Sequence, residues 1–264
     1  MSEIERVSTY NNEAMKRLRI RRVKRVLLSI LGLVLVTLAG LLSYSFAKSP
    51  FFDIKEINVT GNTTVSIDEI VALSGLKIGS NILQYSNARL EERITTQPFL
   101  RMVQVRRILP NRIDIKVVER IPMTVISAEE KYLILDEYGY CLSEVSPSTA
   151  ESWSLPGIRC SPAAIDLKPG EQSVDKGVLA ALTFMSKLDP FFLENVLEID
   201  APTAEKLAVI NRDGLYVLFG QPEDLEKKLQ KYEELLIKNA ATCNADTLEY
   251  VDLRYDTQIT LKWK

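Results

Sequence analysis

The apolar positions of the chain form one long uninterrupted run, followed by shorter segments with helix or strand spacing. The run from Val26 to Ala47 holds 22 residues without a charged side chain, and 13 of them are Leu, Ile, Val or Phe. A helix of that length spans roughly 33 Å at about 1.5 Å per residue, enough for a hydrocarbon core of about 30 Å. A buried core helix would show a polar face, and the apolar region of a cleaved signal peptide is usually only about 7–15 residues long. We therefore predict a transmembrane helix over residues 26–47.

The charges around this run predict its orientation. Residues 1–25 carry eight basic and three acidic side chains, and seven of the basic ones lie between Lys16 and Arg25. By the positive-inside rule we expect this tail in the cytoplasm and everything after Lys48 outside. The whole chain has a net charge of −2 and the tail +5, so the exported part carries −7. Such an acidic part is a poor candidate for binding nucleic acid.

Between residues 51 and 120 the pattern changes from strand to helix and back. We predict a strand over 51–60 with a bulge at Lys55–Glu56, and a helix that begins with the capping-box pair Ser66 and Glu69 and ends at Gly75. A second short helix is predicted over 87–97. Two strands follow, in which the apolar positions alternate: Val103 and Val105, then Ile113, Ile115 and Val117. The predicted order is β-α-α-β-β.

Residues 121–264 indicate a second domain that mixes strands and helices, with Pro122 at the joint. Two hairpins are predicted, over 131–143 with a turn at Asp136–Gly139 and over 207–219. Residues 146–162 are predicted as loop with a short element near Leu155–Ile158. Helices are predicted over 174–188 and from Pro222 onward. The overall fold class is therefore α+β.

The chain ends YVDLRYDTQITLKWK, which is either one long bulged strand or a hairpin turning at residues 256–258. Val251, Leu253 and Tyr255 alternate on one predicted face, and Ile259, Leu261 and Trp263 alternate further on. Nothing follows Lys264 in this sequence, so we expect the last strand to leave an open edge. An open edge is a liability unless a partner pairs with it.

The set of chemically reactive side chains in this sequence lacks the combinations that the common catalytic sites use. The chain has no histidine, which excludes Ser-His-Asp and Cys-His catalysis and His-ligated zinc. The three cysteines are either buried free thiols or include one disulfide, for which Cys141 and Cys160 are the closest pair; Cys243 is the third. Some carboxylates have the chemistry for an acid/base pair, but nothing distinguishes them from turn or surface residues: Asp136, Glu137, Asp252 and Asp256. We predict no enzyme activity, catalytic residue, cofactor, metal site or small-molecule substrate.

The β-α-α-β-β order just outside a membrane helix resembles a POTRA domain. The strings FDIKEINVTGN, LPNRIDIKVVERIP and YVDLRYD, in this order, resemble the FtsQ/DivIB family of bacterial cell-division proteins. This resemblance implies a basic cytoplasmic tail (1–25), a transmembrane helix (26–47), a POTRA domain (51–120) and a C-terminal β domain (121–264). It also implies a single-pass type II protein of the bacterial cytoplasmic (inner) membrane, periplasmic for most of its length and enriched at the division septum.

The resemblance further implies a non-enzymatic scaffold of the divisome that links early division proteins to septal wall-synthesis enzymes. In such proteins the last strand receives a strand from the partner FtsB, which comes associated with FtsL. The match places the contact residues at Arg254 and Tyr255, with Trp263 as a nearby anchor. Two alternatives are a POTRA protein for export or outer-membrane assembly, and a membrane-anchored wall enzyme. Export proteins usually carry repeated POTRA units or a barrel, whereas this sequence shows one POTRA-like unit.

Overall fold

The computed structural model describes residues 3–128, 131–221, 224–238, 246–255 and 259–264, with side chains from Lys24 onward except at Ala128, Phe191 and residues 236–238. The chain divides into two compact units. The first unit consists of Met1–Asn58, Leu76–Ser86 and Arg106–Asp114, and the second consists of Val59–Gly75, Asn87–Val105 and Ile115–Lys264.

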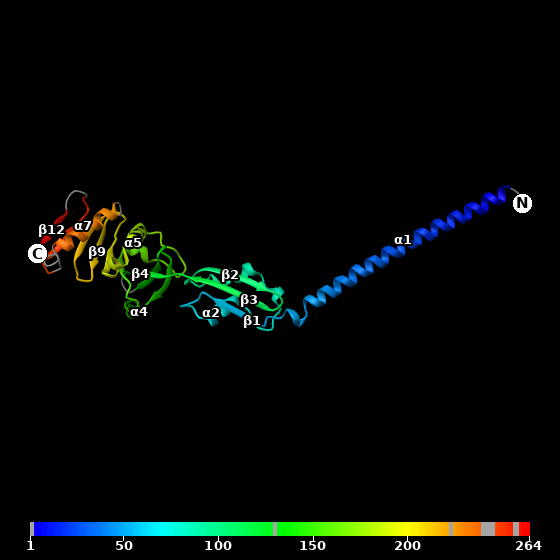
Figure 1. Ribbon diagram of the computed structural model, residues 1–264, viewed down its shortest axis with the longest axis horizontal. Coiled ribbons are helices and arrows are strands. Elements are labelled where there is room, and N and C mark those ends of the chain that lie inside the picture. Colours follow the sequence, from blue (N-terminus) through cyan, green and yellow to red (C-terminus); the bar gives the residue numbers. More distant parts are fainter. Residues whose placement is uncertain (1–2, 129–130, 222–223, 239–245, 256–258) are drawn as a thin grey trace. The chain divides into compact units, whose positions relative to one another are not determined.

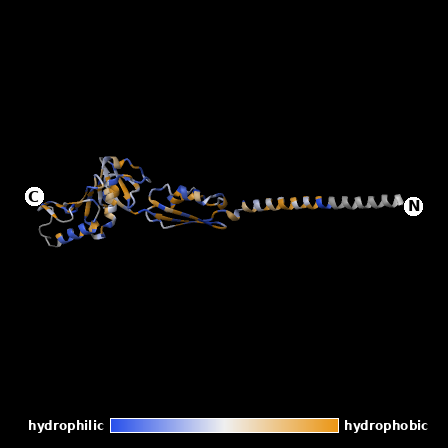
Figure 2. Cartoon of the chain, turned by 90° about the horizontal axis from the view of Figure 1, so that it is seen from above, coloured by the Kyte–Doolittle hydropathy of each residue, from blue (hydrophilic) through white to orange (hydrophobic). Residues whose placement is uncertain are grey.

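The first unit begins with a single long helix, α1 (Glu3–Ala47) (Figure 1). Its part from Lys24 to Ala47 is long and apolar enough to cross a membrane. Hydrophobic residues follow one another along this part of the helix in Figure 2, and none of them is buried against the protein. A helix that is apolar all round and unburied is the form expected of a lipid-facing span.

The segment after α1 has the predicted β-α-α-β-β order. Its strands form a three-stranded sheet in the order β1-β3-β2. The elements are η1 (Pro50–Phe52), β1 (Glu56–Thr60), α2 (Ile67–Ser74), η2 (Ile82–Gln84), α3 (Asn87–Ile94), β2 (Leu100–Ile108) and β3 (Arg112–Glu119). The apolar positions that alternate in the sequence are buried in these strands, including Val105, Ile113, Ile115 and Val117.

Local signals set the ends of these elements. The Ser66 side chain accepts a hydrogen bond from the Glu69 N–H, and Gly75 ends α2 with a positive φ of 68°, as the capping pattern predicts. The first strand is shorter than predicted, because Pro50 begins a 3-10 turn and regular pairing starts only at Glu56. The helix expected to reach residue 97 ends at Ile94.

The remaining strands form one mixed sheet, in which the described residues give the order β12-β11-β10-β9-β8-β7-β4-β5-β6. The strands are β4 (Pro122–Ala128), β5 (Lys131–Asp136), β6 (Cys141–Val145), β7 (Gly157–Arg159), β8 (Val196–Asp200), β9 (Leu207–Asn211), β10 (Tyr216–Gly220), β11 (Leu248–Asp252) and β12 (Thr260–Trp263). The helices are α4 (Pro147–Ser152), η3 (Pro162–Ile165), α5 (Lys176–Lys187), α6 (Pro190–Glu194) and α7 (Leu225–Lys238).

The main core of this domain forms where α5 and α7 meet the inner face of the sheet. Phe184 of α5 and Phe219 of β10 have ring centroids 5.0 Å apart, and Tyr232 of α7 lies 6.4 Å from Phe219. Both predicted hairpins are present, as β5–β6 and β9–β10. The predicted loop 146–162 is wrong in part, because it contains α4, whose Ser146 cap and Pro147 start a short helix. Pro222 lies outside the described residues.

Candidate partner-binding site

The chain ends in a β-hairpin at one edge of the mixed sheet (Figure 1). β11 pairs in parallel with β10, where Val251 lies opposite Val217, and β12 folds back antiparallel to β11, where Leu261 lies opposite Val251. This result selects the hairpin over one long bulged strand; its expected turn at residues 256–258 lies outside the described part of the chain. β12 is the last strand in the sheet order, so its second side has no neighbouring strand among the described residues.

One side of β12 packs on the domain and the other faces outward. Ile259 and Leu261 contact the core, and the intervening Thr260 and Lys262 are exposed; Trp263 is on the same face as Leu261 but lies at the strand end and is 54% exposed. In an antiparallel edge strand, alternate backbone N–H and C=O groups point away from the sheet and remain free to pair. A short edge strand that presents such groups beside an exposed tryptophan has the form needed to receive an added strand.

The edge strands β6 and β2 differ from β12, because some of their outward backbone N–H and C=O groups already form hydrogen bonds. At β6 the backbone N–H of Cys141 donates to the Glu171 carbonyl, and the Cys141 carbonyl accepts from the Gly170 N–H. At β2 the Val105 N–H donates to the carboxylate of Glu91, and the Val105 carbonyl accepts from the Asn87 side chain. These contacts use the groups that an added strand would need.

The residues after β11 place an arginine over the end of β10. Leu253 is buried and donates its N–H to the Leu218 carbonyl at 2.8 Å, which fixes the chain next to the end of β10. Arg254 then binds Asp252 through its guanidinium and lies with that group 5.8 Å from the centre of the Tyr255 ring. Tyr255 is 63% exposed, so the expectation that it shares the inner face of Val251 and Leu253 is wrong. The physical reason is that β11, and with it the alternation, ends at Asp252.

Backbone geometry supports the placement of the arginine. Gly220 has a φ of +70°, and a side-chain carbon at this glycine would come within 3.1 Å of Cγ of Arg254. The aliphatic stem of Arg254 therefore lies over the glycine and lines a groove of about 420 Å³ along with Tyr216 and Leu218. In the same hairpin, Lys262 is paired with Glu249 at 2.9 Å.

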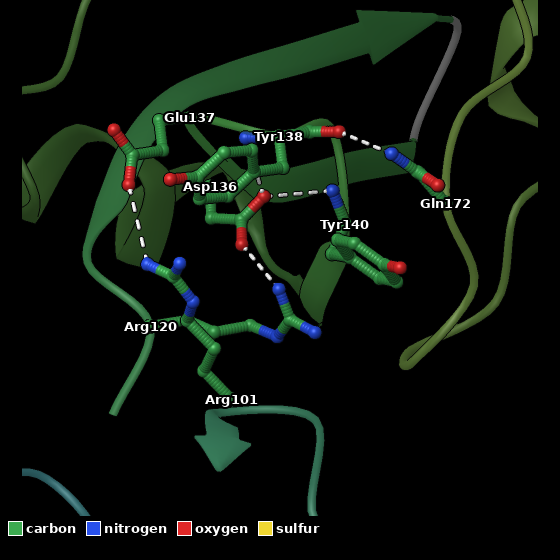
Figure 3. Close-up of polar contacts among 7 residues, drawn as sticks. All are labelled: Arg101, Arg120, Asp136, Glu137, Tyr138, Tyr140 and Gln172. Carbon is green, nitrogen blue, oxygen red and sulfur yellow. Dashed lines mark hydrogen bonds and ion pairs between the residues drawn. The ribbon is translucent and has the colours of Figure 1, made fainter. Parts of the chain in front are cut away.

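The carboxylates named as potential acid/base groups have structural roles. Figure 3 shows the side chain of Asp136 between Arg120 and the turn that follows β5. One oxygen accepts from the N–H groups of Tyr138 and Tyr140, at 2.9 and 2.8 Å, and the other from Arg120 at 2.7 Å. Arg120 also stacks over the Tyr140 ring at 3.7 Å. These hydrogen bonds hold the turn after β5 to Arg120 and give Asp136 a structural role.

Two further carboxylates from that set have cationic neighbours. Glu137 lies 3.8 Å from Arg101, whose guanidinium also lies over the Tyr138 ring (Figure 3). Asp252 is held by Arg254, which lowers the pKa of this carboxyl through the hydrogen bond between them. Asp256 lies outside the described residues. Within the described residues, no group of three His, Cys, Asp or Glu side chains has the arrangement to hold a metal ion.

Of the two alternatives for Cys141 and Cys160, a disulfide or free thiols, the structure has free thiols. Both side chains contact the main apolar core. Burial raises the pKa of each thiol to about 11, so both are protonated and unreactive at neutral pH. Cys243 lies outside the described residues.

Together, the fold and the free edge define a class of protein: a helix of membrane-spanning length, a POTRA-type domain and a strand-rich domain that presents an edge strand. A family model described as "POTRA domain, FtsQ-type" matches residues 52–120. A second, described as "FtsQ/DivIB, C-terminal related", matches residues 163–260. The chain belongs to the FtsQ/DivIB family of cell-division proteins.

Relatives similar in sequence carry the same family name. The chain is 29% identical over 209 residues to cell division protein DivIB of Clostridium acetobutylicum, covering 79% of this chain and 82% of that protein. It is 29% identical over 214 residues to cell division protein FtsQ of Myxococcus fulvus, covering 77% and 72%. Among solved structures, the major extracytoplasmic domain of DivIB from Geobacillus stearothermophilus matches 46% of this chain and 95% of that chain, with 18% identity and a TM-score of 0.30.

Proposed function

We propose that this protein is a non-enzymatic scaffold of the divisome that receives a β-strand from FtsB, associated with FtsL, on the free edge of β12. In this role it would link early division proteins to septal wall-synthesis enzymes. Its N-terminus would lie in the cytoplasm and the chain after Lys48 outside, as the basic residues of the tail (1–25) favour by the positive-inside rule. The division into residues 1–25, 26–47, 51–120 and 121–264 is part of this proposal.

The observation that carries the proposal is the unpaired side of β12, flanked by the exposed side chains of Tyr255 and Trp263. Backbone pairing along the edge would supply general affinity. Aromatic and arginine side chains are the residues most often found to dominate binding energy, so Tyr255, Trp263 and Arg254 supply the specific anchors. The relatives are named as cell division proteins, which supports this role over export, outer-membrane assembly or wall hydrolysis.

A titration of the full-length protein in lipid nanodiscs against the exported C-terminal segment of the organism's own FtsB tests the proposal. Tyr255→Ala should weaken saturable binding by at least about tenfold, which is about 1.4 kcal/mol. Tyr138→Ala is the matched control, because Tyr138 is an exposed tyrosine in the β5–β6 turn, at the other end of the sheet order.

Three outcomes are informative. Binding that Tyr255→Ala weakens and Tyr138→Ala does not supports both the function and the site. Binding that both variants leave unchanged supports the function and contradicts the site. Absence of binding by the folded protein contradicts the proposed function.

A further inference from the structure

The end of α1 is tied to a loop of the same compact unit. The Ala47 carbonyl accepts a hydrogen bond from the side chain of Asn81 at 2.7 Å, and Asn81 itself is buried and bridges to Asp53. The backbone of Ile54 bonds to Gly79 and Ser80 in this loop. Residues 76–86 therefore lie at the end of the helix that spans the membrane.

The turn between β2 and β3 lies at the same place. The Asn111 carbonyl accepts a hydrogen bond from the Lys55 N–H at 2.9 Å, which brings the turn beside the segment that leaves α1. The compact unit that contains α1 also contains residues 48–58, 76–86 and 106–114. We call these three segments the collar.

The collar presents apolar side chains to the outside. Its exposed large apolar residues are Phe51, Ile78, Leu83, Ile108 and Leu109, with Ile78 at 64% and Leu109 at 58%. Phe51 stacks on Phe46 of α1, with ring centroids 5.9 Å apart, and so extends the apolar surface of the helix without a break. Exposed apolar residues gathered in one place mark an interaction surface.

The charge of the collar is opposite to that of the rest of the exported part. The collar holds six basic and three acidic residues, a net charge of +3, within an exported part that carries −7. Arg112 is paired with Asp114, whereas Lys48, Lys77, Arg106 and Arg107 are exposed. Apolar side chains interspersed with basic ones are typical of surfaces that lie at the interface of an anionic membrane.

We propose that the collar docks on the outer leaflet of the membrane that α1 crosses, with its apolar side chains among the acyl boundary and its basic side chains on anionic headgroups. Chain length favours this occupant. Phe51 is four residues beyond Ala47, so it lies within about 14 Å of the end of the span at about 3.5 Å per residue. The headgroup layer extends about 5–8 Å beyond the hydrocarbon core, so the lipid surface is within reach of the collar.

Photo-cross-linking of the full-length protein in vesicles tests the docking. The photoreactive residue p-benzoylphenylalanine replaces Ile78 or Leu109 in the collar, and Val174 or Leu197 as exposed apolar controls in the second unit. The vesicles contain phosphatidylethanolamine with phosphatidylglycerol, and lipid adducts are measured by mass spectrometry. We expect adduct yields at positions 78 and 109 at least tenfold above those at 174 and 197. Equal yields at all four positions, or no adduct at 78 and 109, would overturn the proposal.

A charge variant tests the role of the basic residues. The double variant Arg106→Gln and Arg107→Gln should lower the adduct yield at position 109 at least threefold in vesicles with phosphatidylglycerol, and leave it unchanged in phosphatidylcholine alone. An unchanged yield in the anionic vesicles would contradict the contact with headgroups. The melting temperature of the variant, compared with that of the unsubstituted protein, controls for loss of fold.

Discussion

Arg254 donates two hydrogen bonds to the carboxylate of Asp252, from Nε to Oδ1 at 3.0 Å and from Nη2 to Oδ2 at 2.7 Å. The side chain of Asp252 is buried, whereas that of Arg254 is half exposed. The aspartate therefore orients the guanidinium, and donors on its outer side remain accessible to a partner. A bidentate ion pair of this kind fixes the orientation of the guanidinium and also neutralises the buried carboxylate.

The first prediction concerns this orientation. Asp252→Asn replaces one of the two carboxylate oxygens that accept from the Arg254 guanidinium with an NH2 group. The backbone N–H of Arg254 can still donate to the remaining side-chain oxygen, as it does to Oδ1 of Asp252 at 3.0 Å. We expect the affinity for the FtsB segment to fall by about tenfold, or about 1.4 kcal/mol. The melting temperature should fall as well, because the hydrogen bond from Arg254 lowers the pKa of the buried Asp252 carboxyl in the folded state. Arg254→Lys should weaken binding similarly, because lysine lacks the planar fork. Wild-type affinity for both variants in the titration would contradict the positioning role.

The second prediction concerns Glu119 at the end of β3, whose carboxylate accepts hydrogen bonds from the residues that precede α2. Burial would raise the pKa of Glu119, but the Thr63 hydroxyl and the N–H groups of Val65, Thr63 and Thr64 lower it to about 2. A carboxyl with a lowered folded pKa stabilises the protein above its unfolded pKa and loses that contribution as the pH falls toward the folded value. We expect this loss between about pH 4.5 and pH 2.

Glu119→Gln should reproduce that loss at neutral pH and lower the free energy of unfolding by about 1–3 kcal/mol, discounted for the partial exposure of the group. Urea unfolding at pH 7 and pH 3 measures it. Because the variant cannot titrate at this position, its difference from wild type should be smaller at pH 3. Glu92→Gln in α3 is the control, since Glu92 is exposed. A pH-independent difference would contradict this account.

The third prediction reverses the usual effect of alanine in a helix. Glycine to alanine normally stabilises a helix interior by about 1 kcal/mol. Gly177 lies in the first turn of α5, and a side-chain carbon there would be 2.2 Å from the Ala201 carbonyl oxygen. Gly177→Ala should therefore destabilise the protein by about 2–4 kcal/mol, because α5 and the segment that follows β8 must separate. An unfolding free energy equal to or above that of wild type would show that the close approach is absent.

The fourth prediction compares two arginine pairs at the start of the mixed sheet (Figure 3). In the Arg120–Asp136 pair, both side chains are buried or nearly so, with 14% and 2% exposed. Arg120→Leu leaves an unpaired buried carboxylate and should cost about 3–5 kcal/mol. Arg101→Leu is the matched control, because Arg101 and Glu137 are half exposed and 3.8 Å apart, a pair worth about 0–1 kcal/mol. Equal unfolding midpoints for the two variants would contradict the assignment.

Much of the fold could be predicted because local signals agreed with tertiary packing. The Ser66 cap, the Gly75 stop and the alternation in β3 each act within a few residues, and each appears in the structure. Strand β8 (Val196–Asp200) is not predicted by the sequence pattern, because a register irregularity between Val196 and Glu198 interrupts the strict alternation that marks a strand. Its place in the sheet depends on parallel pairing with β7, a contact that no local pattern encodes.

The candidate site was predictable only in part. The resemblance placed Arg254, Tyr255 and Trp263 near one another. The structure has all three in one hairpin with accessible side chains, but Arg254 and Tyr255 follow the end of β11, whereas Trp263 lies at the far end of β12, opposite Leu248. The supporting residues could not be predicted, because Gly220 meets Arg254 through the parallel pairing of β10 and β11, across more than 30 positions of sequence. The pairing of Arg120 with Asp136 could not be predicted either, because Arg120 follows β3 and Asp136 lies at the end of β5.

The most direct test of strand addition is amide hydrogen exchange in the full-length protein with and without saturating FtsB segment. We expect exchange in residues 259–263 to slow at least tenfold, because an added strand would bond to the free backbone groups of β12. The β6 segment, at the opposite end of the sheet order, should not change. Unchanged exchange in residues 259–263 while the segment is bound would contradict the central claim that β12 receives the partner.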